Sequence, residues 1–102
     1  MSVLKVNNDN FEKEVLQSEK TVLVDFYATW CDPCKMLSPI VDEVAEEVND
    51  VKVCKVDIDE ARDLAAKYEI MSIPTLLVFK NGNVVNNSLG LVKKEKILDL
   101  IK

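Results

Sequence analysis

Residues 22–35 read VLVDFYATWCDPCK, an apolar run that leads directly into two cysteines separated by two residues. The first part, residues 22–28, is almost continuously apolar, as expected for a strand covered on both faces. From Cys34 onward, apolar residues recur at three- and four-residue spacing, which predicts a helix. These apolar positions are Met36, Leu37, Ile40, Val41, Val44 and Val48. The stretch therefore predicts a buried strand followed at once by a helix, with the cysteines at the junction.

The two cysteines, Cys31 and Cys34, can close and reopen a small disulfide ring that Pro33 stiffens. Cys31 would stand at the helix N-cap, where unpaired backbone N–H groups and the helix dipole favour a thiolate. Only a thiolate attacks a disulfide, so we expect Cys31 to be the exposed nucleophile and Cys34 the shielded resolving thiol. A structural bridge or half of a zinc site is the alternative. Zinc usually needs four ligands, but the chain has no histidine and only one further cysteine, Cys54.

Two charged residues interrupt the apolar strands. An unpaired buried charge is costly, so Asp25 should either stay protonated or find a partner. A neutral Asp25 near the dithiol can relay a proton as the second thiol is deprotonated. Lys55 lies in a second apolar strand, residues 51–56, and either tunes Asp25 from there or extends to the surface. Cys54 should point to the opposite face of that strand, as a small buried hydrophobe or, alternatively, a regulatory thiol.

The remaining segments predict one mixed sheet with helices on both faces, an α/β class. Asp9 and Glu12 fit a capping box that opens a helix running to about residue 16. Asn81-Gly82 is the dipeptide favoured in tight hairpin turns. Pro39 should kink the helix that follows the cysteines. Further strands are expected at residues 2–6, 75–79 and 84–89, further helices at 60–68 and 93–102, and residues 1–102 are predicted to be a single domain.

Composition narrows the classes of partner. The net charge of −5 argues against nucleic acid, because binding phosphates needs a basic patch. No apolar run is long enough to cross a membrane, and the first ten residues lack the pattern of a signal peptide. We therefore expect a cytoplasmic protein without nucleic-acid or membrane partners. Three cysteines in such a chain indicate redox or metal chemistry rather than a disulfide scaffold.

At this point the residues resemble a known family, the thioredoxins. Residues 25–35 look like the active-site segment of that family, and Ile73-Pro74-Thr75 looks like its cis-proline loop. Lys80-Asn81-Gly82 is similar to its hairpin turn, and Gly90 falls where the family keeps a glycine beside the substrate groove. The resemblance covers the whole chain. It implies the thioredoxin fold, a central five-stranded mixed sheet flanked by four helices.

The resemblance also implies a function, that of a general protein-disulfide reductase and electron carrier. Cys31 would attack a protein disulfide to give a mixed disulfide, and Cys34 would then release the reduced substrate. Asp25 resembles the buried carboxylate of the family, and Lys55 the lysine near it. The implied partners are disulfide-containing proteins and a thioredoxin reductase, with no cofactor and no metal, and we expect a monomer. An oxidase or isomerase of the same fold and a binding module without turnover are the alternatives.

The resemblance places a substrate groove around the dithiol. Its apolar lining would be Trp30, Ile73, Pro74 and Gly90, with Pro74 cis and against the dithiol, and the ring residues Asp32 and Pro33 would also meet the substrate. Asp32 replaces the usual glycine. Its charge should disfavour the Cys31 thiolate, so we predict a redox potential no more oxidising than with glycine. Substrate and reductase preference stay open, because four more positions depart from the family: Tyr27, Glu69, Met71 and Ser72.

Overall fold

The computed structural model describes residues 2–102 and contains a five-stranded sheet in the order β1-β3-β2-β4-β5. The strands β1 and β2 both run parallel to β3, whereas β4 is antiparallel to β2 and β5 is antiparallel to β4. The predicted mixed sheet is thereby confirmed, with a first strand that is shorter than expected. The strands are β1 (Leu4–Val6), β2 (Thr21–Tyr27), β3 (Val51–Asp57), β4 (Thr75–Lys80) and β5 (Asn83–Leu89).

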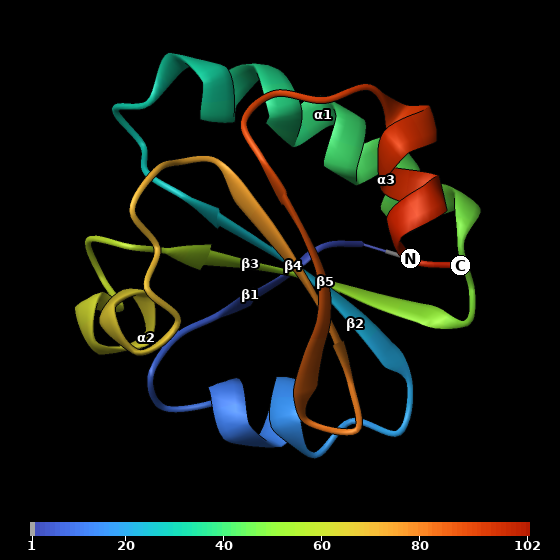
Figure 1. Ribbon diagram of the computed structural model, residues 1–102, viewed down its shortest axis with the longest axis horizontal. Coiled ribbons are helices and arrows are strands. Elements are labelled where there is room, and N and C mark those ends of the chain that lie inside the picture. The colour runs from blue at the N-terminus through green and yellow to red at the C-terminus, as the bar shows by residue number, and fades with distance from the viewer. Residues whose placement is uncertain (1) are drawn as a thin grey trace.

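Helical segments cover both faces of this sheet (Figure 1). On one face, α1 (Asp32–Glu47) and α3 (Lys94–Leu100) pack against a core that includes Leu23 of β2. On the other face lie η1 (Glu12–Leu16) and α2 (Arg62–Lys67). All four predicted helices are present, although α2 is shorter than expected and η1 is a π-helix. Among residues 2–102, none of the helices has the length and apolar character needed to span a membrane.

The central strand β2 is buried on both faces. Residues 22–26 are all buried, because β2 lies between β3 and β4 and helices cover both sides. A strand in this position has no solvent-facing side, which explains its unbroken apolar sequence. The prediction made from the opening stretch is confirmed, and it leaves Asp25 as the one charged residue inside the strand.

The turn between β4 and β5 shows why the sequence needs Asn81-Gly82. Both residues have positive φ angles, 53° for Asn81 and 79° for Gly82, as a tight hairpin turn requires. A Cβ atom on Gly82 would also lie only 3.0 Å from the carbonyl oxygen of Leu16. The predicted hairpin is confirmed, and the turn packs closely against the end of η1.

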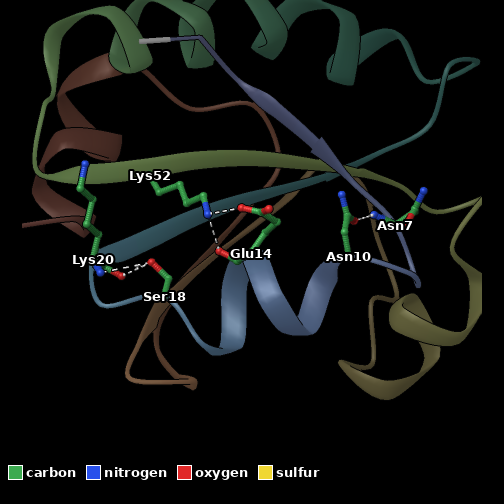
Figure 2. A network of polar contacts seen from close by, with 6 residues as sticks. All are labelled: Asn7, Asn10, Glu14, Ser18, Lys20 and Lys52. Atoms are coloured by element: carbon green, nitrogen blue, oxygen red, sulfur yellow. Dashed lines mark hydrogen bonds and ion pairs between the residues drawn. The ribbon is translucent and has the colours of Figure 1, made fainter.

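The predicted capping box at Asp9 and Glu12 is wrong. The N-cap of η1 is Phe11, which makes no side-chain cap hydrogen bond. The loop before it is instead closed by Asn10, whose Oδ1 accepts from the backbone N–H of Asn7 at 2.7 Å (Figure 2). The Oδ1 of Asn7 accepts from the N–H of Asp9 at 2.9 Å. Asparagine side chains compete for backbone groups in this way at turns, and here they replace the helix cap.

A lysine fastens η1 to the sheet. The ammonium of Lys52, on β3, donates to the carbonyl oxygen of Glu14 at 2.9 Å and to its carboxylate (Figure 2). Ser18 and Lys20 close the following turn through two hydrogen bonds of 3.1 Å. This short helix is therefore held by a partly buried ion pair as well as by its apolar contacts.

The prediction was wrong for one residue of the apolar face of α1. Leu37, Val41 and Val44 are buried against the sheet, as the spacing predicts, but Met36 is 60% exposed. Pro39 lies inside α1 without ending it. The apolar period alone did not distinguish Met36 from its buried neighbours.

Candidate active site

The helix α1 begins at the cysteine pair. Cys31 is its N-cap residue, and Cys31 and Cys34 form a disulfide with a Cα–Cα distance of 5.3 Å. The backbone N–H of Cys34 donates to the Cys31 sulfur at 3.2 Å, and Pro33 lies in the first turn, where its missing N–H costs nothing. After reduction the same N–H and the helix dipole favour a negative sulfur at Cys31. The predicted N-cap position is confirmed.

Cys31 is less accessible than expected, whereas Cys34 is shielded as predicted. Cys31 is 6% exposed and Cys34 is 3% exposed, so the prediction of an exposed Cys31 is wrong for this disulfide form. The pair packs with Ala28 and with the partly buried Tyr27, Ile58 and Ile73. These apolar neighbours cover the ring, a feature that the local motif does not reveal. Cys31 remains the more exposed of the two residues, in the predicted order.

A loop from the second half of the chain faces the dithiol. The Ile73–Pro74 peptide bond is cis, as expected, and the Ile73 carbonyl oxygen lies 3.8 Å from the Cys31 sulfur. The N–H of Gly90 donates to the Pro74 carbonyl at 2.8 Å. Because β4 runs antiparallel to β2, its beginning lies at the same sheet edge as the end of β2. The structure thus brings Ile73, Pro74 and Gly90 together beside Cys31.

Trp30 presents an exposed ring next to the disulfide. Its side chain is 65% exposed, yet its Nε1–H donates to the carboxylate of Asp59 at 2.8 Å. The N–H of Asp59 in turn donates to the carboxylate of the buried Asp57 at 2.9 Å. The sequence interpretation missed Asp59. Only its position in the sequence could have indicated it. Asp59 follows the end of β3, and the parallel strands β2 and β3 have their carboxyl ends at the same end of the sheet.

Asp32 points into solvent from the first turn of α1. Its side chain is 90% exposed, and its carboxylate lies 3.8 Å from the ammonium of Lys35. Solvent and this lysine both weaken the field that Asp32 exerts on its surroundings. The effect of Asp32 on the dithiol should therefore be small.

Asp25 is buried, and a charged residue, Lys55, lies opposite it on the adjacent strand. Asp25 is 4% exposed, it pairs with Lys55 in the β2–β3 register, and its Oδ1 has no hydrogen-bond partner within residues 2–102. Burial raises the pKa of Asp25 to about 7, while Lys55 lowers it and Asp42 raises it further. The predicted adjacency of Asp25 and Lys55 is confirmed. A carboxyl group with a pKa of about 7 can both take up and release a proton near neutral pH.

Lys55 is partly buried rather than fully extended into water. Its ammonium lies 5.9 Å from the centroid of the Tyr27 ring, which follows Asp25 by two residues on the same face of β2. An ammonium over a ring face is attracted to the ring. Lys55 therefore stays beside the sheet, close to the strand that carries Asp25.

The third cysteine, Cys54, lies on the opposite face. It is fully buried in the core beneath η1 and α2, as alternation predicts, and burial raises the pKa of its thiol to about 11. Such a thiol is almost never ionised at neutral pH, so Cys54 is not a competing nucleophile. Within residues 2–102, His, Cys, Asp and Glu side chains form no group of three or more that could hold a metal ion.

Comparisons with known proteins agree with this geometry. Residues 2–102 match the family model described as Thioredoxin. The chain is 50% identical over 97 residues to a thioredoxin of Rickettsia felis, an alignment covering 94% of this chain and 92% of that protein. It is 45% identical over 102 residues to the thioredoxin of Bacillus subtilis, covering 99% and 96%. A thioredoxin of Pyropia yezoensis is 47% identical over 98 residues, covering 95% of this chain and 92% of that protein.

Proposed function

Because the chain belongs to the thioredoxin family and has its dithiol–disulfide redox function, we propose that it acts as a general protein-disulfide reductase. The observation that carries this proposal is the Cys31–Cys34 disulfide at the N-terminus of α1, facing the Ile73–Pro74 loop. We take residues 1–102 to act as one thioredoxin-like domain. Its electrons would come from a thioredoxin reductase, and it would act in the cytoplasm, where thiols are kept reduced.

The proposed reaction transfers two electrons in two exchanges. In the reduced protein, the Cys31 thiolate attacks one sulfur of a substrate disulfide, forming a mixed disulfide and releasing the other substrate sulfur as a thiolate. The Cys34 thiol then loses its proton and attacks the Cys31 sulfur. The Cys31–Cys34 disulfide forms, and the second substrate sulfur leaves. The substrate disulfide is reduced to two thiols while the dithiol of the protein is oxidised.

Asp25 is the proposed acceptor of the Cys34 proton. Its buried position and its pKa of about 7 support this role, because an ionised fraction is available at neutral pH to act as a base. Lys55, opposite Asp25 in the sheet, would stabilise the ionised form. Neither residue needs to contact the substrate.

The residues around Cys31 would receive the substrate chain. Ile73, Pro74 and Gly90 would form one wall, with Gly90 hydrogen-bonded to Pro74, and the exposed Trp30 would offer an apolar contact. Asp59 would hold that ring through its hydrogen bond to the indole. From the ring itself, Asp32 and Pro33 would meet the substrate beside the reacting sulfur.

A Cys34→Ser variant tests the proposal. Without the resolving thiol, the mixed disulfide on Cys31 cannot be released, so the variant should capture substrate proteins in bonds that reducing agents break. Cys31→Ser should capture none and serves as the control. Binding that is unchanged in both variants would instead indicate a module without turnover. The midpoint potential of the Cys31–Cys34 pair shows whether the protein reduces or oxidises its substrates. A reducing value would support the reductase, and an oxidising value would favour an oxidase.

A further inference from the structure

A surface cavity lies beside the lysine that faces Asp25. Its volume is about 340 Å³, and it is lined by Ser2, Val3, Asp42, Glu46 and Lys55. The two carboxylates come from α1, eight and twelve residues after Cys34, and the ammonium comes from β3. The cavity therefore brings acidic side chains of the active-site helix to the partner of the buried carboxyl group.

Strand alternation places Asp25 and Lys55 under α1. Leu23 and Val53, two residues earlier on their strands, belong to the core that packs against α1 and α3. Side chains two residues apart share a face, so Asp25 and Lys55 also point to the α1 side. Asp42 follows the buried Val41 on α1 and is itself exposed. Lys55 thus has Asp25 on the adjacent strand and Asp42 across the cavity.

The other neighbours of Asp25 bring little charge to it. On β4 its register partner is the apolar Leu76, and on its own strand the nearest titratable group is Tyr27. Lys5 of β1 is in register with Lys55 and forms an ion pair of 2.9 Å with Glu60. The charges that act on Asp25 are those of Lys55 and Asp42, and they act in opposite directions.

We propose that Asp42 is a positioning residue for the proton step, because its carboxylate lines the same cavity as the Lys55 ammonium and opposes the effect of Lys55 on Asp25. This inference rests on the proposed function, in which Asp25 takes the proton of Cys34. Burial is the main cause of the raised pKa of Asp25, Lys55 lowers that pKa, and Asp42 acts against Lys55. A higher pKa makes ionised Asp25 a stronger base for the Cys34 proton, and Asp42 adds to that pKa without touching substrate or sulfur.

The test is to measure the pKa of Asp25 by NMR of its carboxyl group, in the oxidised forms of the Asp42→Asn variant and of the unsubstituted protein. The pKa of Asp25 should fall by roughly 0.3 unit at low salt, a size typical of one exposed charge acting through water. The shift should shrink in 0.5 M salt, since Asp42 is exposed to solvent. The pH profile of protein-disulfide reduction should move in the same direction.

Glu43→Gln is the matched control. It removes the same charge from the next position of α1, but Glu43 faces Lys94, 3.7 Å away, rather than the cavity. An Asp25 titration that is identical in the two variants would overturn the inference. So would a shift of the activity profile by Asp42→Asn that persists when Asp25→Asn is also present, because Asp42 would then act elsewhere. The NMR titration needs no turnover, so its result stands apart from the Cys34→Ser capture that tests the function itself.

Discussion

Asp25→Asn should remove a stability loss that the protein otherwise suffers as the pH rises. The pKa of Asp25 is about 7 in the folded protein, against 3.8 for an ordinary aspartate, because burial disfavours the charged form. Between these values the unfolded chain has released the proton while the folded protein still holds it, so stability falls with increasing pH. At about 1.4 kcal/mol per pKa unit, the loss between pH 5 and pH 8.5 amounts to about 2–3 kcal/mol.

Urea unfolding of the oxidised protein at these two pH values measures the effect. The stability of Asp25→Asn relative to the unsubstituted protein should rise by about 2–3 kcal/mol from the lower to the higher pH. Taking this difference cancels the other titrating groups. Asp50→Asn, which removes an exposed carboxylate between α1 and β3, should show no such change. An advantage of Asp25→Asn that is equal at both pH values would refute the reasoning.

Asp32→Gly should leave the Cys31–Cys34 pair equally or more oxidising. Its equilibrium constant with glutathione should change by less than about tenfold, because water screens the Asp32 charge. A clearly more reducing variant would contradict this. Gly82→Ala should lower the free energy of unfolding by about 1–3 kcal/mol, since its Cβ would meet the Leu16 carbonyl. Gly90 also has a positive φ, but a Cβ there would meet open space, so Gly90→Ala should lower the free energy of unfolding by only about 1 kcal/mol. Equal losses for the two variants in urea unfolding would contradict this difference. Cys54 should resist iodoacetamide at pH 8 until the protein unfolds, because burial raises its pKa to about 11, and rapid labelling of the folded protein would disprove this.

Much of the site could be predicted because its signals are local. The apolar run before Cys31 and the helical period after it determine the strand, the N-cap and the order of the two thiols. That Lys55 lies near Asp25 was implied by the family resemblance, and the parallel pairing of β2 with β3 bears it out. Asn81-Gly82 specified its hairpin for a steric reason, since both residues must adopt positive φ angles.

The features that were missed depend on contacts between distant segments. Asp59 accepts a hydrogen bond from Trp30, 29 positions away in the sequence, and neither residue type predicts that bond. The burial of Cys31 likewise comes from Ile58 and Ile73, which lie in loops far from it in the sequence. The wrong capping box at Asp9 has another cause. Two local signals competed there, and the hydrogen bonds of neighbouring asparagines outweighed the cap.

The antiparallel pairing of β4 with β2 has a consequence for biosynthesis. Cys31 and the Ile73 carbonyl meet across 42 positions, so a ribosome releases the dithiol long before the loop that will face it. A nascent chain ending ahead of β4 carries both thiols but lacks one of the two sheet neighbours of β2. The complete site can assemble only once most of the chain has been synthesised.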